Sequence, residues 1–292
     1  MEKNRNLTKK ITESALMIAL ATVLSMLKLI EMPYGGSVTF ASMLPIVIIA
    51  YRHGIGVGLA SGFTFAVIQQ LLGLSNLSYV TGWQSVVAVI TLDYALAFTA
   101  LGFGGIFRGK LTRFINDNPK RQASELATGT LFACVLRYLC HTIAGATVWA
   151  GLSIPSGAAL IYSIGYNATY MLPEAIVSAM VIAYLGARVD FSRSLPERFS
   201  ALRRAASGRG SGACEIFPHI SALLIIVAVA VDTVLIAPML QDAETGAFSF
   251  AGLSEVKWWL VITLTALCAL AAAALLIAKR AALRCEKKDK AE

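Results

Sequence analysis

The stretch ELATGTLFACVLRYLCHTIAGATVWA, residues 125–150, is mostly apolar and contains no proline. As a helix rising about 1.5 Å per residue, it is long enough to cross the hydrocarbon core of a bilayer, which is roughly 30 Å thick. It nevertheless carries Arg137, His141 and Trp149, with spacings of four and eight residues. Gly145 lies between the last two. At about 100° per residue these positions share one stripe, so we expect a membrane helix with one polar and aromatic face.

Apolar runs of similar length recur along the whole chain. The chain has 292 residues, of which 57% are hydrophobic and only 14% are charged. A soluble domain would normally contain about 25% charged residues. The sequence therefore predicts an all-α polytopic membrane protein. We place eight spans, at residues 11–30, 38–52, 54–73, 83–107, 125–150, 158–187, 219–240 and 258–278.

The formal net charge of +8 lies mainly in the connections on one side of these spans. Basic clusters precede the first span and follow the fourth, sixth and eighth, whereas the connections 74–82 and 151–157 contain no Lys or Arg. The positive-inside rule then predicts that both termini are cytoplasmic. The charge thus indicates topology and contact with anionic lipid rather than a nucleic-acid partner. No small-residue cleavage site follows the first apolar run, so we expect no removable signal peptide.

Residues 191–218 differ from the spans because they are charged and rich in Gly and Ser. This composition predicts a cytoplasmic linker between a six-span body, residues 1–190, and an appendage, residues 219–292. The appendage comprises two spans and a basic cytoplasmic tail. We expect the body to be complete without it, so deleting residues 210–292 should spare ligand binding.

Metal and catalytic patterns are missing from the sequence. The five cysteines form no C-x-x-C pair and no His/Cys metal spacing, which predicts free thiols. The sequence also has no Ser/His/Asp triad pattern and no H-E-x-x-H motif. We therefore expect neither a cofactor nor a metal, and no enzymatic activity.

Counting along the spans places three polar side chains at one depth. Asp93 lies about ten residues, or roughly 15 Å, below the outer end of the fourth span. His141 and Asn167 lie at nearly the same level in the fifth and sixth spans, and Arg137 lies one turn deeper. Ionisable groups in a bilayer are costly and tend to be functional. The topology thus predicts an outward-facing cavity lined by a carboxylate, an imidazole and an amide.

Aromatic rings lie near the mouth of this expected cavity, with Trp149 on the fifth span and Tyr162 on the sixth. Together with Asp93, they favour a flat cationic ligand, held by charge attraction and cation–π contact. Three structural alternatives remain open. The two rings can belong to an aromatic belt at the membrane boundary. His141 can simply bond between helices, and Arg137 can form an ion pair with Asp93.

Four stretches carry a family resemblance. They are PYGGSVTFASMLPI (33–46), LDYALAFTALG (92–102), RYLCHTIAGATVW (137–149) and YSIGYNATYMLPE (162–174). With them, the first 190 or so residues resemble the thiamine-specific substrate-binding (S) component of energy-coupling factor (ECF) transporters, the bacterial vitamin importers. The resemblance implies a compact six-helix bundle in the cell membrane that holds thiamine near its outer face. It also implies a membrane coupling subunit and two ATPase subunits as partners.

The resemblance also assigns thiamine-binding roles to individual positions. Asp93 stands where the family usually has Glu, and Arg137 stands where Lys is common. The implied substrate-binding residues are Asp93, Tyr94, Arg137, His141, Trp149, Tyr162, Asn167, Trp83 with Tyr79 as its alternative, and Tyr34 in an outer loop that serves as a lid. Two departures stand out. The Asp93 side chain is one methylene shorter than Glu, and the appendage has no counterpart in the family's basic plan.

The first span carries Ala15, Ala19 and Val23 at four-residue spacing, a small-residue face that permits close helix approach. In the resembled family a similar face docks on the coupling subunit. Ordinary packing within the chain explains the same pattern equally well.

Three alternatives to a thiamine-binding S component remain. One is an S component for a related heterocyclic vitamin or precursor. Another is a self-sufficient carrier that uses Asp93 and His141 as proton relays. The third is an intramembrane enzyme on a lipid-linked substrate, which would need a catalytic dyad.

Overall fold

The structure is a computed structural model that describes residues 2–32, 35–39, 41–115, 118–150, 156–193, 197–198, 213–242 and 247–289. The helices of the body are α1 (Glu2–Met26), α2 (Leu44–His53), α3 (Ile55–Leu72), α4 (Trp83–Val89), α5 (Ala97–Thr99), α6 (Asn118–Thr147) and α7 (Ala159–Gly186). A π-helical segment, η2 (Ile90–Leu96), joins α4 to α5, and η3 (Ala100–Gly105) is a 3₁₀ helix. Further 3₁₀ turns of the body are η1 (Leu74–Tyr79), η4 (Lys110–Arg113) and η5 (Ser156–Ala158).

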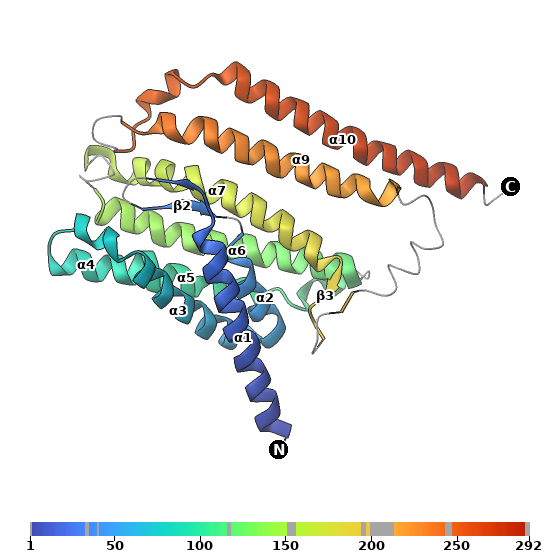
Figure 1. Cartoon of the computed structure of the whole chain (residues 1–292), viewed down its shortest axis with the longest axis horizontal. Coiled ribbons are helices and arrows are strands. Elements are labelled where there is room, and N and C mark those ends of the chain that lie inside the picture. The colour runs from blue at the N-terminus through green and yellow to red at the C-terminus, as the bar shows by residue number, and fades with distance from the viewer. Residues whose placement is uncertain are drawn as a thin grey trace.

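The appendage consists of α9 (Ala213–Ile236) and α10 (Trp258–Asp289), with the 3₁₀ turns η6 (Ala237–Leu240) and η7 (Ala251–Ser254) between them. Helices α6, α7, α9 and α10 run side by side, and α1 lies obliquely to them (Figure 1). Near one end of α7, the His219 ring of α9 packs edge-to-face on Tyr184, with centroids 4.9 Å apart. The appendage is therefore packed against the body.

The predicted fold class is confirmed. Six of the described helical stretches are long and apolar enough to cross a membrane: Ile55–Leu72, Trp83–Thr112, Asn118–Thr147, Ala159–Gly186, Ile216–Leu240 and Trp258–Ala282. They correspond to the last six of the eight predicted spans. The chain is thus a multi-pass, all-α membrane protein whose body contains two further helices.

The first two predicted spans differ from the structure. Span 11–30 is helical only to Met26, and its last residues form strand β1 (Lys28–Glu31). Span 38–52 begins in strand β2 (Ser37–Thr39), which pairs antiparallel with β1. Gly35 and Gly36, with φ of 100° and 86°, lie between the strands, in backbone conformations that favour glycine. The predicted connection at residues 31–37 contains this turn, but hydropathy missed the two strands that flank it.

Helix α2 is too short to cross a bilayer and is enclosed by its neighbours. Nine of its ten residues are buried, and Ile46 and Val47 belong to the central core with Phe65, Leu101 and Leu126. Its carboxyl end is buried too, so its last carbonyl groups need donors from elsewhere in the chain.

A polar cluster supplies those donors. The Arg108 guanidinium donates hydrogen bonds to the carbonyl oxygens of Tyr51 and Arg52. Arg52 in turn forms an ion pair with Glu13 of α1, with Nη2 and Oε2 2.9 Å apart. The positive φ of 92° at Gly54 then lets the chain turn directly into α3. These contacts fix α1, α2 and the end of the fourth helical stretch relative to one another.

Free thiols are seen at Cys134, Cys140 and Cys268, whereas the side chains of Cys214 and Cys285 lie outside the described residues. Within the described ranges there is no cluster of three or more His, Cys, Asp or Glu side chains that could hold a metal ion. Residues 199–212, half of the expected linker, also lie outside the described residues.

Candidate functional site

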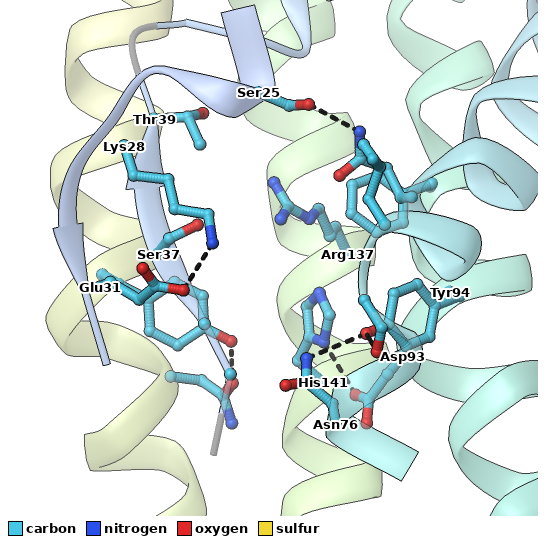
Figure 2. A pocket seen from close by; sticks show the side chains of 18 of the residues that line it. Ser25, Lys28, Glu31, Ser37, Thr39, Asn76, Asp93, Tyr94, Arg137 and His141 are labelled. Carbon is cyan, nitrogen blue, oxygen red and sulfur yellow. Dashed lines mark hydrogen bonds and ion pairs between the residues drawn. The ribbon is translucent and has the colours of Figure 1, made fainter. Parts of the chain in front are cut away.

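A cavity of about 560 Å³ lies between the β1–β2 hairpin and the helices of the body. Its wall comes from the hairpin, the end of α3 with η1, the π-helical segment η2, α6 and α7. Lys28 and Glu31 of the hairpin lie on one side of the space, and Asp93, Arg137 and His141 lie on the other (Figure 2). The volume is within the range of roughly 300–1,000 Å³ that is typical of small-molecule sites.

Asp93, on η2, is the carboxylate that lies next to α6 in the cavity wall. Its Oδ1 lies 2.8 Å from Nδ1 of His141, and its Oδ2 accepts a hydrogen bond of 2.9 Å from Nε1 of Trp149. The residue sits within a π-helical turn, a local feature often found at functional sites. Within the described chain, Asp93 has no Lys or Arg partner. The carboxylate is therefore oriented by His141 and Trp149, with no permanent cation bonded to it in the described chain.

Asp93, His141 and Asn167, which counting places at one depth, all line this cavity, so the structure brings the three side chains together. Trp149 lies two residues beyond the end of α6, so it is not part of the helical stripe that its spacing predicts. Its ring is only 8% exposed and bonds to Asp93. That placement excludes the aromatic-belt alternative for Trp149.

Arg137 pairs with Glu174 of α7 rather than with Asp93. Its Nη1 lies 3.2 Å from Oε2 of Glu174, and its guanidinium lies over the Phe98 ring, 4.7 Å from the centroid. Glu174 is 1% exposed and also accepts a hydrogen bond from the Thr39 hydroxyl. The alternative of an Arg137–Asp93 ion pair is therefore wrong. The pair instead links α6, α7 and the residues just after the hairpin turn.

Asn167 belongs to a tightly packed wall where α6 meets α7. Its Nδ2 donates to the backbone oxygen of Ser163 at 2.9 Å, and its Oδ1 accepts from the Tyr170 hydroxyl at 2.6 Å. A Cβ added at Gly145 would lie 2.2 Å from Oγ of Ser163. Gly145 is thus needed for the close approach that brings Asn167 to the cavity.

The hairpin is fastened to the same wall. The Tyr166 hydroxyl donates a hydrogen bond of 2.6 Å to the backbone oxygen of Gly35, in the hairpin turn. Gln69 of α3 donates to the Ser25 hydroxyl at 2.8 Å, just before β1. Lys28 and Glu31 form an ion pair within the first strand. The hairpin therefore closes one side of the cavity, held to α7 at its turn, while the end of α1 that leads into it is held to α3.

The other predicted site residues are placed as follows. Tyr94 lines the cavity, and its hydroxyl accepts a hydrogen bond of 3.2 Å from Nδ2 of Asn76. Trp83 and Tyr79 are 72% and 47% exposed and are not in the cavity wall. Tyr162 packs against Phe250 of the appendage, with centroids 4.9 Å apart. Tyr34 lies outside the described residues.

Sequence reasoning assigned no role to Tyr166 and Tyr170 of the cavity wall, or to the buried Glu174 that pairs with Arg137 beside it. Glu174, Tyr166 and Tyr170 are buried or half-buried close to the predicted residues. The rarity of intramembrane carboxylates was a usable signal for Glu174, because such groups are costly without a partner. The spacing of Tyr166 and Tyr170, four residues apart on the helix that carries Asn167, was a signal for the two rings.

Two buried nitrogen atoms near the cavity lack a hydrogen-bond partner within the described part of the chain, Nε2 of His141 and Nε of Arg137. Buried polar groups in proteins are nearly always bonded. The site can thus offer an oriented carboxylate, two nitrogen groups and aromatic rings to a small polar ligand.

Comparison with known proteins identifies the family. Residues 11–191 match the family described as "Thiamine transporter protein (Thia_YuaJ)". This chain belongs to that thiamine transporter family. The match covers the body, including every cavity-lining residue, and stops before α9.

Relatives in the family agree with this assignment. The thiamine transporter ThiT of Bacillus subtilis is 34% identical over 189 residues, which is 63% of this chain and 93% of that protein. ThiT of Lacticaseibacillus paracasei is 26% identical over 184 residues, 60% of this chain and 85% of that protein. A solved structure of ThiT from Listeria monocytogenes has the same fold, with a TM-score of 0.52, 24% identity, and coverage of 62% of this chain and 94% of that one.

Proposed function

We propose that this chain is the thiamine-binding S component of an ECF-type importer and captures thiamine from outside the cell. The observation that carries the proposal is the Asp93 carboxylate, held by His141 and Trp149 on the wall of a cavity of about 560 Å³. The family match supports thiamine as the ligand, because two relatives that match the body are named thiamine transporters.

The chemistry of the cavity suits thiamine, which combines a permanently cationic thiazolium ring with an aminopyrimidine. The Asp93 carboxylate attracts the cation, and the neighbouring rings of Trp149 and Tyr166 offer faces to it. The unpartnered Nε2 of His141 can bond to a heterocycle nitrogen or amine, as donor or acceptor according to its tautomer. These are recognition contacts, and none of them requires a catalytic step or a cofactor.

Titration of the isolated chain in detergent, without ATP, tests the proposal. A variant in which Trp83, Trp258 and Trp259 are changed to Phe keeps Trp149 as its one tryptophan. We expect saturable quenching of Trp149 fluorescence by thiamine, with the same affinity measured by calorimetry on the unaltered chain. The absence of saturable binding of thiamine or of its pyrimidine half would contradict the proposal.

The partner subunits of an ECF importer are also part of the proposal. Ala15, Ala19 and Val23 are exposed on α1, so packing within the described chain does not account for this small-residue face. A coupling subunit can approach α1 closely there. We place both termini in the cytoplasm, where two ATPase subunits would supply the energy, and we assign the chain no enzymatic activity of its own.

A second candidate function is a self-sufficient proton-coupled carrier. The observation that favours it is the contact of 2.8 Å between Asp93 and His141, two groups that could exchange a proton. Uptake by the chain alone in proteoliposomes, abolished by an uncoupler, would support the carrier. Uptake that requires the coupling and ATPase subunits would support the S component.

A further inference from the structure

The connection between α9 and α10 contacts the residues that form the cavity. Its two described arms, 237–242 and 247–254, come together through backbone hydrogen bonds from Asp242 to Ala247 and from Ser249 to Leu240. Figure 1 shows this connection at the same end of the molecule as the start of α7. The family match ends at residue 191, so this contact is made by a part of the chain outside it.

Two phenylalanines of the second arm pack on α7. Phe248 is 1% exposed, and its ring meets Tyr162 and Tyr166 edge-to-face, with centroids 6.2 Å and 5.7 Å apart. Phe250 lies 4.9 Å from Tyr162. A Cβ added at Gly165 would lie 2.7 Å from the Phe250 ring. Gly165 thus leaves the space that this aromatic contact needs.

The first arm contacts the hairpin of the body. The Gln241 amide lies 3.2 Å from the sulfur of Met32, next to the hairpin turn. Ala237 belongs to one buried cluster with Met32, Val38 and Tyr170. Met32, in turn, is held to the hairpin by a backbone hydrogen bond to Gly36. The appendage therefore touches both the α7 wall and the hairpin that closes the cavity.

Tyr166 connects these contacts to the site. The Tyr166 ring packs edge-to-face on Phe248, and its hydroxyl donates a hydrogen bond to the backbone oxygen of Gly35 in the hairpin turn. Tyr166 also lines the cavity. When Phe248 holds the Tyr166 ring in place, it also fixes the hydroxyl that donates the hydrogen bond to the hairpin. Loss of Phe248 would free that ring and weaken the fastening.

We propose that the α9–α10 connection is a positioning element of the binding site, in which Phe248 and Phe250 hold Tyr162 and Tyr166 and so keep the hairpin closed over the ligand. This inference rests on the proposed thiamine-binding function. Its consequence is kinetic, because a closed hairpin slows departure of the ligand and differences of affinity arise mainly in dissociation rates. On this inference the body folds without residues 237–254 but loses thiamine faster. This reverses the expectation that deletion of residues 210–292 spares binding.

The test measures the dissociation rate of labelled thiamine from the full chain after a chase with unlabelled thiamine. The variants are Phe248→Ala, Phe250→Ala and Gly165→Ala. We expect each to accelerate dissociation by about tenfold, in line with the loss of aromatic contacts. Gly165→Ala is the most informative, because alanine favours a helix more than glycine does. Faster dissociation in that variant cannot come from a weaker helix.

Gly56→Ala is the matched control. It makes the same change within α3, at a position where an added Cβ meets nothing within 4 Å. Its dissociation rate should equal that of the wild type. Gly165→Ala acts by displacing the phenylalanine rings, and Phe250→Ala removes the ring that the new Cβ meets first. The double variant Gly165→Ala/Phe250→Ala should therefore dissociate clearly more slowly than the product of the two single effects predicts.

The melting temperature of the ligand-free protein separates positioning from folding. The inference expects Phe250→Ala and Gly165→Ala to melt close to the wild type while they lose thiamine quickly. Unchanged dissociation rates in both would overturn it, whatever the behaviour of the more deeply buried Phe248→Ala. A wild-type chain that binds no thiamine would instead overturn the proposed function, and with it this inference.

Discussion

The indole nitrogen of Trp149 donates a hydrogen bond of 2.9 Å to Asp93, joining a residue just beyond α6 to the π-helical turn of η2. The bond fixes the direction of the carboxylate. It also places the tryptophan ring beside the charge, so a ligand that reaches Asp93 alters the surroundings of Trp149.

Changing Asp93 should weaken thiamine binding through loss of charge. In Asp93→Asn we expect a loss of about 1–3 kcal/mol, as for removal of a charge-assisted contact. A neutral thiamine analogue without the cation should bind almost equally well to both proteins. Calorimetric titration with the two ligands measures the difference. Glu255→Gln is the control, because it also removes one negative charge, at a position outside the cavity wall. Equal losses of affinity for both ligands in Asp93→Asn would mean that Asp93 supports the fold instead.

Breaking the buried pair of Arg137 and Glu174 should destabilise the protein. Glu174→Ala leaves the guanidinium without its anion, which costs about 3–5 kcal/mol when such a pair is buried. We expect a large fall in the melting temperature in detergent. The double variant Arg137→Met/Glu174→Leu should recover most of the stability, because an apolar pair of similar volume replaces a buried ion pair at little cost. Equal melting temperatures of the single and double variants would show that the charges are not coupled.

Adding a methyl group at Gly145 should disturb the cavity, because Gly145 lies where α6 contacts α7. In Gly145→Ala the new Cβ would meet Ser163 at 2.2 Å and the Asn167 amide at 3.4 Å, so α6 and α7 must separate. We expect thiamine affinity to fall by about tenfold, the equivalent of roughly 1.4 kcal/mol. Gly56→Ala again serves as the control, and wild-type affinity in Gly145→Ala would show that Asn167 adjusts freely.

Blocking the exposed face of α1 should separate binding from uptake. Ala15→Trp or Ala19→Trp places a large ring on the face that is open to a coupling subunit. Vitamin uptake in cells should fall strongly, while thiamine affinity in detergent stays within about threefold, because the site is untouched. Ala273→Trp, at an exposed position of α10, is the matched control. Joint loss of affinity and uptake in the α1 variants would disprove docking at this face.

Counting along the chain was enough to predict which polar side chains of three spans come together in the cavity. The outer ends of the spans follow from the placement of charge, so the depths of Asp93, His141 and Asn167 could be obtained by subtraction. The direction of each side chain could not, because it depends on how each helix is rotated. Arg137 therefore turned out to face Glu174, and Tyr162 to face Phe250.

Hydropathy could not predict the β1–β2 hairpin. Residues 28–39 are short, partly apolar and flanked by longer apolar runs, so a window wide enough to find a span absorbs them. The exposure of Trp83 could not be predicted either. A sequence motif shows that an aromatic residue lies near the site, but it does not show toward which side of the helix the ring points. The contacts between the appendage and the body join positions far apart in sequence. The hydrophobic periodicity of each segment therefore could not predict them.

The π-helical turn at Ile90–Leu96 sets the phase of the whole fourth helical stretch. It holds one residue more than a regular α-helical turn, so positions after it are rotated by about 100° from where an unbroken helix would put them. Deleting a single residue within the turn would let it relax into ordinary α-helix. Either Asp93 would then swing away from Trp149, or the glycine-rich half that follows would lose its fit against α3 and α6. The length of this stretch is therefore as constrained as its chemistry, and an insertion or deletion of one residue there should be tolerated far less well than most substitutions.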